Sequence, residues 1–226
     1  PSLRMLDRVT DDAMFRDNWC VFSRAKTDTV LCSRQMTNVL GAIDSEELSA
    51  LRPRLVKDLI RHKQLPDAFL LKCLMVVSDG TGIFSSWEEH CLQCLTQRHG
   101  DGSATYLHNV LEIKVVTWGG LAFSVLTEPQ LNPEDGQYVK QDCESKAFHR
   151  ALPRLKQIFA REPIVHLLDS LYCNGPIFRA IEEAKQMFIC CFQPGSIPTL
   201  YDEALTLLKL NPHNRTTQTL RLEGHR

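Results

Sequence analysis

Residues 68–82 read AFLLKCLMVVSDGTG, and they indicate what kind of sheet the chain builds. Residues 69–77 are a nearly unbroken apolar run, which is typical of a strand covered on both faces, because its side chains alternate between the two faces. The run stops at an acidic residue, Asp79, and the glycine-containing residues 80–82 predict a turn directly after it. We therefore expect a buried strand that ends on an aspartate.

Four more segments downstream have the apolar content typical of strands, and two amphipathic segments lie among them. The strands are expected at residues 105–116, 121–127, 164–168 and 187–192. The helices are expected at residues 140–159 and 175–185. This order of three strands, helix, strand, helix and strand predicts an α/β architecture, in which a mixed sheet has helices on its faces.

Residues 1–65 have a different character, with apolar residues at helical spacing and two helix-start signals. Ser33 precedes one apolar stripe, and residues 44–47, which read DSEE, precede another. The two helices fit either a DNA-binding helix-turn-helix or an ordinary packing unit, and both interpretations stay open. We predict three parts: a helical segment at residues 1–65, a core at residues 66–205, and an irregular, truncated tail at residues 206–226.

The composition is that of a globular protein without a strong overall charge. Of the 226 residues, 43% are hydrophobic and 23% are charged, and the formal net charge is −1. DNA binding would then depend on local basic patches, because no bulk positive field attracts phosphate. Two such patches occur, and each also fits an ordinary solvated surface. They comprise Arg52, Arg54, Lys57, Arg61, His62 and Lys63, and then His213, Arg215, Arg221, His225 and Arg226.

Nine cysteines at irregular spacing favour a reducing cytoplasm over a secreted disulfide scaffold. No stretch approaches the roughly 20 apolar residues of a membrane span, and no signal peptide is recognisable, so we expect no membrane association. The chain starts with Pro1 instead of methionine, and we interpret both ends as cuts through a longer protein.

Two of the predicted strands end on an aspartate, Asp79 in one and Asp169 in the other. Ligand sites in open α/β sheets lie beyond the carboxyl ends of strands, so these two side chains are expected to meet. Carboxylate oxygen is the ligand that Mg²⁺ prefers, and a pair of such ions can assist phosphodiester cleavage. The alternative is that each aspartate caps a helix or a turn.

Several separate motifs occur in order within residues 15–205. They are CSRQM at residues 32–36, VSDGTGIFSS at 77–86, HC at 90–91, YLH at 106–108, KQDCE at 140–144 and LDSLYCNGP at 168–176. Together they resemble the motifs of the DDE transposases of bacterial insertion sequences. The resemblance implies an RNase H-like fold, preceded by a small helical segment.

The resemblance also implies catalysis of DNA transposition, with Asp79 and Asp169 as catalytic residues and as ligands of Mg²⁺ or Mn²⁺. Enzymes of this family use metal-activated water to nick DNA, and the exposed 3′ hydroxyl then attacks target DNA. The implied partners are transposon ends and target DNA, and the implied assembly is a homodimer. The implied location is the bacterial cytoplasm, with action at the nucleoid.

The sequence departs from that family at the third acid, a glutamate on a helix well downstream of the last core strand. Glu203 and Glu223 are the downstream acids, and neither lies in the expected context. We therefore predict that the chain ends before its third ligand and is inactive by itself. One alternative is an inactive remnant that acts at most as a DNA-binding or structural module. Another is a nuclease of the same fold that cuts without joining.

Four further residues are candidates for accessory roles beside the two aspartates. Asp142 and Glu144 stand at the head of a predicted helix, where negative charge also stabilises the helix dipole. Tyr172 and Asn174 follow Asp169, beyond the end of a strand, although residues 174–176 also fit a helix cap. For each pair, a place in the catalytic pocket and a structural role stay open.

Cys91 and Cys94 are separated by two residues, which is the spacing of half a structural zinc site. His108, His99 or Cys143 could complete the set of ligands. The alternative is that these are ordinary buried or loop cysteines, and the sequence does not decide between the two.

Overall fold

The computed structural model describes residues 7–8, 12–23, 30, 32–89 and 91–214. The chain divides into two compact units, Pro1–Arg52 and Pro53–Arg226. The first unit contains α2 (Ala13–Ser23), α3 (Ser33–Ala42) and the beginning of α4 (Ser45–Arg61). Both predicted helix starts are confirmed, since α3 begins at Ser33 and α4 begins just after Asp44, whose Oδ1 accepts a hydrogen bond from the Glu46 N–H at 2.8 Å.

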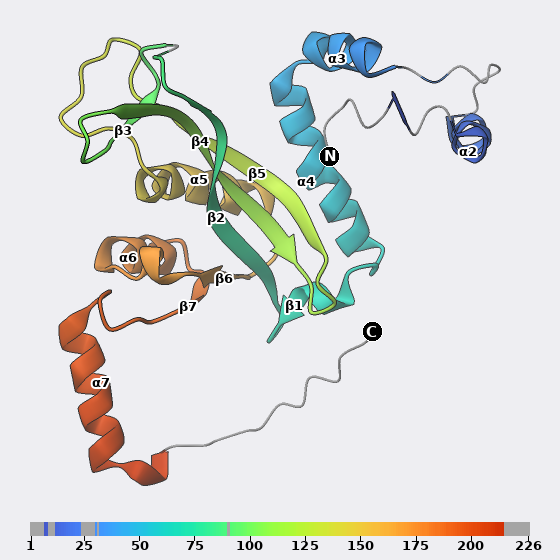
Figure 1. The fold of residues 1–226 in the computed structure, drawn as a ribbon. Helices are drawn as coiled ribbons and strands as arrows, with labels where there is room; N and C mark the ends of the chain where they lie inside the picture. Colours follow the sequence, from blue (N-terminus) through green and yellow to red (C-terminus); the bar gives the residue numbers. More distant parts are fainter. Residues whose placement is uncertain (1–6, 9–11, 24–29, 31, 90, 215–226) are drawn as a thin grey trace. The chain divides into compact units, whose positions relative to one another are not determined.

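The second unit is built around a seven-stranded mixed sheet (Figure 1). Its strands are β1 (Phe69–Leu70), β2 (Cys73–Ser86), β3 (Leu95–Arg98), β4 (Ala104–Val116), β5 (Ala122–Gln130), β6 (Ile164–Leu168) and β7 (Met187–Cys190). The order is β3-β4-β2-β6-β7, with β1 paired to β2 and β5 paired to β4. Strands β2, β4 and β5 are antiparallel to one another in turn, whereas β6 and β7 run parallel to β2. This order and these directions are those of an RNase H-like sheet, so the predicted fold class is confirmed.

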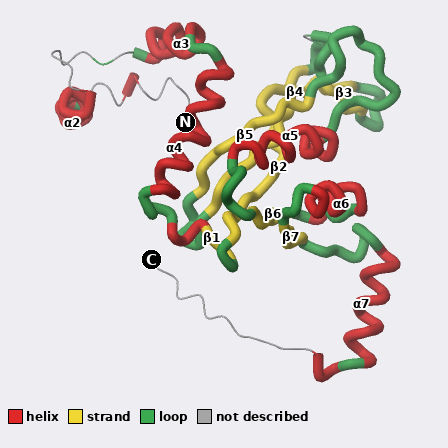
Figure 2. The backbone as a smooth tube through the Cα atoms, turned by 180° about the vertical axis from the view of Figure 1, so that it is seen from behind, coloured by secondary structure: helices red, strands yellow, loops and turns green. Residues whose placement is uncertain are grey.

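Helices α5 (Glu144–Ile158) and α6 (Gly175–Glu183) lie next to one another on one side of the sheet, as Figures 1 and 2 show from opposite directions. Their apolar faces pack against every second residue of β2, including Leu74 and Val76. This is the main core, because alternation along the strand sends every second side chain to the helix-covered face. The helical members of the core are Ala147, Phe148, Ala151, Leu152, Leu155, Ile177 and Ile181.

The prediction of one strand from residue 69 that ends at Asp79 is wrong at both ends. Leu71 and Lys72 have positive φ values of 49° and 69°, so a two-residue turn separates β1 from β2. At the other end β2 continues to Ser86, because the long strand β4 pairs with it along its whole second half. The glycines that predicted a turn lie inside the strand, and the register shifts between Gly82 and Phe84.

The other differences concern boundaries and short elements. Helix α5 begins at Glu144, four residues later than predicted, and the short edge strand β3 was not predicted. Helix α7 (Pro198–Leu210) extends into the segment expected to be an irregular tail, and residues 215–226, with most of the second basic patch, lie outside the described residues. None of the helices in the described ranges combines the length and the apolar character of a membrane span.

Candidate active site

Asp79 and Asp169 lie just beyond the last paired residues of the parallel strands β2 and β6. The last paired positions are Val77 and Leu167, and Asp79 lies two residues further along β2. Asp169 directly follows the end of β6, where its Oδ1 accepts a hydrogen bond from the Leu171 N–H at 2.9 Å and caps the next turn. Neighbouring strands lie about 4.8 Å apart, and equivalent residues point to the same face. Both side chains are exposed.

Glu144 is the third carboxyl group of this region, although it comes from a different element. It is the first residue of α5 and is half-buried. Burial raises its pKa, and the negative charges of Asp79 and Asp169 raise it further. Hydrogen bonds from the Tyr172 hydroxyl and the Gly80 N–H act in the opposite direction but do not compensate. Asp79 and Asp169 therefore both lie close enough to Glu144 to repel its negative charge, and we name Asp79, Glu144 and Asp169 the acidic triad.

Gly80 leaves the space that the Glu144 carboxylate occupies. The sequence had indicated only that Gly80 belongs to a turn. A Cβ at position 80 would lie 2.2 Å from Glu144 Oε2 and 2.8 Å from its Cδ. Real Cβ atoms do not approach other heavy atoms so closely, so any other residue would displace the carboxylate. The signal in the sequence was a glycine next to an acidic residue within an otherwise apolar strand, where glycine often marks a close approach.

Tyr172 holds Glu144 from the other side. Its hydroxyl donates a hydrogen bond to Glu144 Oε1, and its ring packs edge-on against Phe148 with 5.3 Å between the ring centroids. Burial raises the pKa of Tyr172, and the hydrogen bond to Glu144 raises it further, so the phenol stays protonated and remains a donor. Asn174, two residues after Tyr172, has a structural role. Its Oδ1 accepts a hydrogen bond from the Ile177 N–H at 3.1 Å and caps α6.

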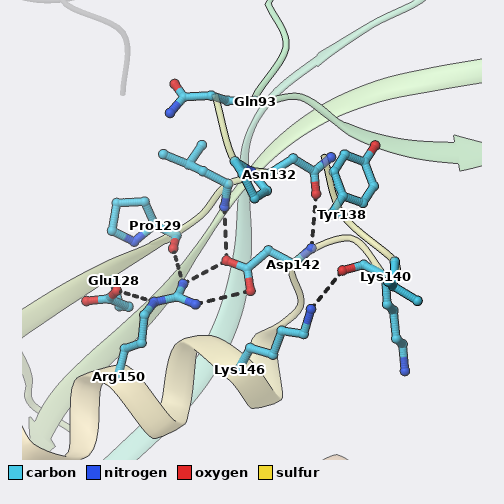
Figure 3. A pocket seen from close by; sticks show the side chains of 12 residues that line it. Gln93, Glu128, Pro129, Asn132, Tyr138, Lys140, Asp142, Lys146 and Arg150 are labelled. Atoms are coloured by element: carbon cyan, nitrogen blue, oxygen red, sulfur yellow. Dashed lines mark hydrogen bonds and ion pairs between the residues drawn. The ribbon is translucent and has the colours of Figure 1, made fainter. Parts of the chain in front are cut away.

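Asp142 lies in a separate ion-pair network, which Figure 3 shows. Its Oδ2 is 2.7 Å from Nη2 of Arg150 and also accepts a hydrogen bond from the Leu131 N–H at 3.1 Å. Burial alone would raise the pKa of Asp142, but the bonds from Arg150 and from the Cys143 N–H outweigh burial and lower it. Arg150 also contacts Glu128 Oε1 at 2.8 Å, so the network joins the start of α5 to β5.

The donor set of the acidic triad consists of carboxylate oxygen, which suits a hard divalent cation such as Mg²⁺ or Mn²⁺. A cation would also remove the repulsion that raises the pKa of Glu144. The oxygen atoms of the three carboxyl groups do not all lie within 4.8 Å of one another. Among the described residues, the ligand atoms of a second cluster do.

That second cluster consists of Cys91, Cys94 and His108. The two sulfur atoms are 3.6 Å apart, and His108 Nε2 lies 3.4 Å from Cys91 Sγ and 3.2 Å from Cys94 Sγ. Two other candidate ligands lie elsewhere: Cys143 is the N-cap residue of α5, and His99 Nε2 is 2.7 Å from Thr105 Oγ1. The arrangement can hold a metal ion through two sulfurs and one nitrogen.

No protein-family model matches the sequence, and no curated protein matches it. Among solved structures, the chain is similar to the Mos1 mariner paired end complex with Mn, at 13% sequence identity and a TM-score of 0.29. The similarity covers 91% of this chain and 63% of that chain, so this chain spans less than two thirds of that protein. The fold of the second unit follows from the order and directions of its strands.

Proposed function

We propose that this chain is the catalytic core of a DNA transposase that cleaves and joins DNA strands with the help of Mg²⁺ or Mn²⁺. The observation that supports this most is the acidic triad, formed where the two adjacent parallel strands β2 and β6 come to lie beside the first turn of α5. Sites of this kind occur beyond the carboxyl ends of strands in open α/β sheets. The resemblance of the sequence motifs to those of DDE transposases gives the class of reaction.

Glu144 is the third acid in this proposal. The sequence predicted that the third ligand lies beyond the end of the chain, and the downstream acid that the structure describes, Glu203, is exposed on α7. Glu144 is held at the triad by Tyr172 and Gly80, and its pKa responds to the charges of Asp79 and Asp169. A third carboxylate makes an inactive remnant the weaker interpretation, because two metal ions need more ligands than two aspartates provide.

The acidic triad and Tyr172 have different roles in the proposed reaction. Asp79 and Asp169 are exposed and would hold the cations where a phosphate can reach them, while half-buried Glu144 would hold its oxygen in a fixed place. Tyr172 would keep the Glu144 carboxylate oriented through its hydroxyl. Bound divalent ions would supply positive charge to the phosphate and lower the pKa of the attacking water. The protein's own contribution is therefore positioning and electrostatic stabilisation.

DNA would be held by local basic patches, because the chain as a whole is close to neutral. In the second unit, the end of α4 carries exposed Arg54 and Arg61 and half-buried Lys57, and His62 and Lys63 follow it directly. Arg61 is engaged with Asp58 at 2.7 Å, an exposed pair that costs little to open. We assign this patch to contacts with DNA phosphates.

The test combines metal binding with DNA cleavage by the full chain. Mn²⁺ or Mg²⁺ should raise the melting temperature of the parent and support nicking of supercoiled plasmid, followed by joined products. Asp79→Asn, Glu144→Gln and Asp169→Asn should each remove both effects, whereas Asp135→Asn, an exposed carboxylate outside the triad, should keep them. Cleavage without joined products would indicate a nuclease, and DNA binding without any nicking would favour the remnant. A parent whose melting temperature ignores both metals would refute the proposed site.

A further inference from the structure

We propose a second metal site, a zinc site formed by Cys91, Cys94 and His108 at the end of the sheet where β3 meets β4. It is separate from the acidic triad in residues and in chemistry, because thiolate and imidazole ligands select zinc, whereas carboxylates select magnesium or manganese. Three features of the cluster support this site: the distances between its ligand atoms, the local backbone, and the hydrogen bonds that fix the turn.

The distances within the cluster are a few tenths of an ångström shorter than those between ligands around a tetrahedral zinc ion. With Zn–S bonds of about 2.3 Å and Zn–N bonds of about 2.0–2.1 Å, a tetrahedron has edges of about 3.8 Å between two sulfurs and about 3.6 Å between sulfur and nitrogen. The sulfur atoms of Cys91 and Cys94 are 3.6 Å apart, and the two contacts to His108 Nε2 are 3.4 Å and 3.2 Å. A disulfide would instead bring the two sulfurs to about 2.05 Å. The cluster therefore fits a bound ion and does not fit a Cys91–Cys94 disulfide.

The backbone brings the ligands together through strand register and a tight turn. Leu95 pairs with Leu107 in the antiparallel β3–β4 pair, so the preceding residue, Cys94, stands beside His108. The Cys94 N–H donates to the Cys91 carbonyl at 3.2 Å and closes the turn that carries both cysteines. Cys91 and Cys94 lie on one turn, and His108 lies on the neighbouring strand. A metal bound to all three would therefore join two segments that are distant in sequence.

Asn132 fixes this turn to the remainder of the unit. Its side-chain amide donates to the Cys94 carbonyl at 2.7 Å, and its backbone N–H donates to the Gln93 carbonyl at 3.1 Å. Asn132 is buried, and its Oδ1 accepts a hydrogen bond from the Asp142 N–H at 3.0 Å, just before α5. The cysteine turn is therefore held in place independently of any disulfide, while Cys94 is buried and Cys91 remains exposed to solvent. Water would fill the fourth position of the ion on the exposed side.

The site has a structural purpose. β3 has only four residues and lies at the edge of the sheet, so its own hydrogen bonds stabilise it weakly. An ion held between the turn before β3 and the middle of β4 would keep this edge ordered, and binding energy of this kind contributes directly to folding.

The experiment measures zinc in the full chain purified under reducing conditions from zinc-supplemented cells. The parent should hold about one zinc ion per chain with sulfur and nitrogen or oxygen ligands by X-ray absorption, as expected for such a site. Cys91→Ser and Cys94→Ser should each lower the zinc content at least tenfold, and Cys191→Ser, an exposed cysteine outside the cluster, should leave it unchanged. A chelator should also make the β3 segment more sensitive to protease.

Two outcomes would overturn the zinc site. One is a parent chain without zinc, or with zinc in a coordination sphere that contains no sulfur, a result that does not depend on whether any variant folds. The other is a parent whose mass shows the loss of two hydrogens from a Cys91–Cys94 disulfide under the same reducing conditions. Neither result depends on nicking activity, so this proposal and the transposase proposal fail separately.

Discussion

Gly80 and Glu144 approach each other so closely that a Cβ on residue 80 would lie 2.2 Å from Glu144 Oε2. Gly80→Ala should therefore displace the carboxylate, which is the flexible end of a side chain, and leave the fold intact. We expect the affinity for Mn²⁺ and the rate of nicking to fall by roughly 10- to 100-fold, since displacements of about 1 Å at a catalytic group have effects of this size. The measurements are metal titration by calorimetry and the plasmid nicking assay.

Gly82→Ala is the matched control for this substitution, in the same strand and two residues away. A Cβ there would lie 3.4 Å from Asn109 Oδ1, an ordinary contact, and the backbone at Gly82 is not in the left-handed region. It should lower the melting temperature at most slightly and preserve metal binding. If both alanine variants lose metal binding equally, the close approach to Glu144 is not the reason.

Tyr172→Phe removes the hydroxyl group that donates a hydrogen bond to Glu144. The hydrogen bond from the Tyr172 hydroxyl lowers the pKa of Glu144, so its loss should raise that pKa further above the usual value. A carboxylate binds metal only when ionised, and the pH at which Mn²⁺ binding reaches half its maximum should therefore move upward. Stability should fall by about 1 kcal/mol for the lost hydrogen bond. An unchanged pH midpoint in the variant, measured by titration of Mn²⁺ at several pH values, would contradict this account.

The order of sheet elements was predictable because it depends on local signals. The apolar runs, the hairpin at residues 117–121 and the Asn174 cap each specify structure within a few residues, and they sufficed to give the order of strands and helices along the chain. The RNase H-like fold itself was implied by the resemblance of the motifs. The turn expected after Asp79 was wrong for a reason outside that stretch. Strand β4 supplies hydrogen-bond partners up to Ser86, and pairing with a distant strand overrides a local preference for a turn.

The composition of the site was less accessible from sequence. Asp142 and Glu144 are two residues apart at the start of one helix and looked equivalent, yet one bonds to Arg150 and the other to Tyr172. Their difference arises from tertiary contacts, namely the space above Gly80 and the arrival of Arg150 one and a half turns into α5. The Cys91, Cys94 and His108 cluster was visible as a spacing pattern, but only the β3–β4 register identifies His108 as the third member.

Asp142→Asn tests whether the network of Asp142, Arg150 and Glu128 is structural. The buried carboxylate accepts hydrogen bonds from Arg150, Leu131 and Cys143 through both of its oxygen atoms. An amide has one oxygen that accepts and one NH2 group that only donates, so it cannot accept all of them. We expect a loss of roughly 1–3 kcal/mol in the free energy of unfolding, measured with urea at neutral pH. Because the folded-state pKa of Asp142 is lowered, the parent's advantage should be complete above the usual pKa of about 3.9 and disappear as the pH falls below it.

Asp135→Asn is the control for this prediction. Asp135 is exposed and accepts a single hydrogen bond, from the Gln137 N–H at 2.9 Å. Its substitution should change the free energy of unfolding by less than about 0.5 kcal/mol. Equal effects of the two substitutions would show that the ion-pair network contributes nothing beyond a surface turn.

His166 should make the stability of the core depend on pH in mildly acidic solution. The ring is fully buried in β6, with Nε2 2.7 Å from Gln186 Oε1 and no hydrogen-bond partner for Nδ1 in the part of the chain that the structure describes. Burial lowers its pKa, and the bond to Gln186 opposes that shift only in part. The unfolded chain therefore takes up a proton near the usual pKa of about 6.5, whereas the folded chain does not. The contribution of His166 to stability is complete above about pH 6.5 and declines as the pH falls below it, by at most about 1.4 kcal/mol per pH unit.

The measurement compares urea unfolding of the parent and of His166→Gln between pH 8 and pH 5. Glutamine cannot titrate, so the difference in the free energy of unfolding between parent and variant should be constant at high pH and change in favour of the variant below about pH 6.5. His149→Gln, at an exposed position of α5, should give a curve parallel to that of the parent. Parallel curves for His166→Gln as well would mean that the buried ring takes up its proton in the folded state, and that some group in the core accepts the charge.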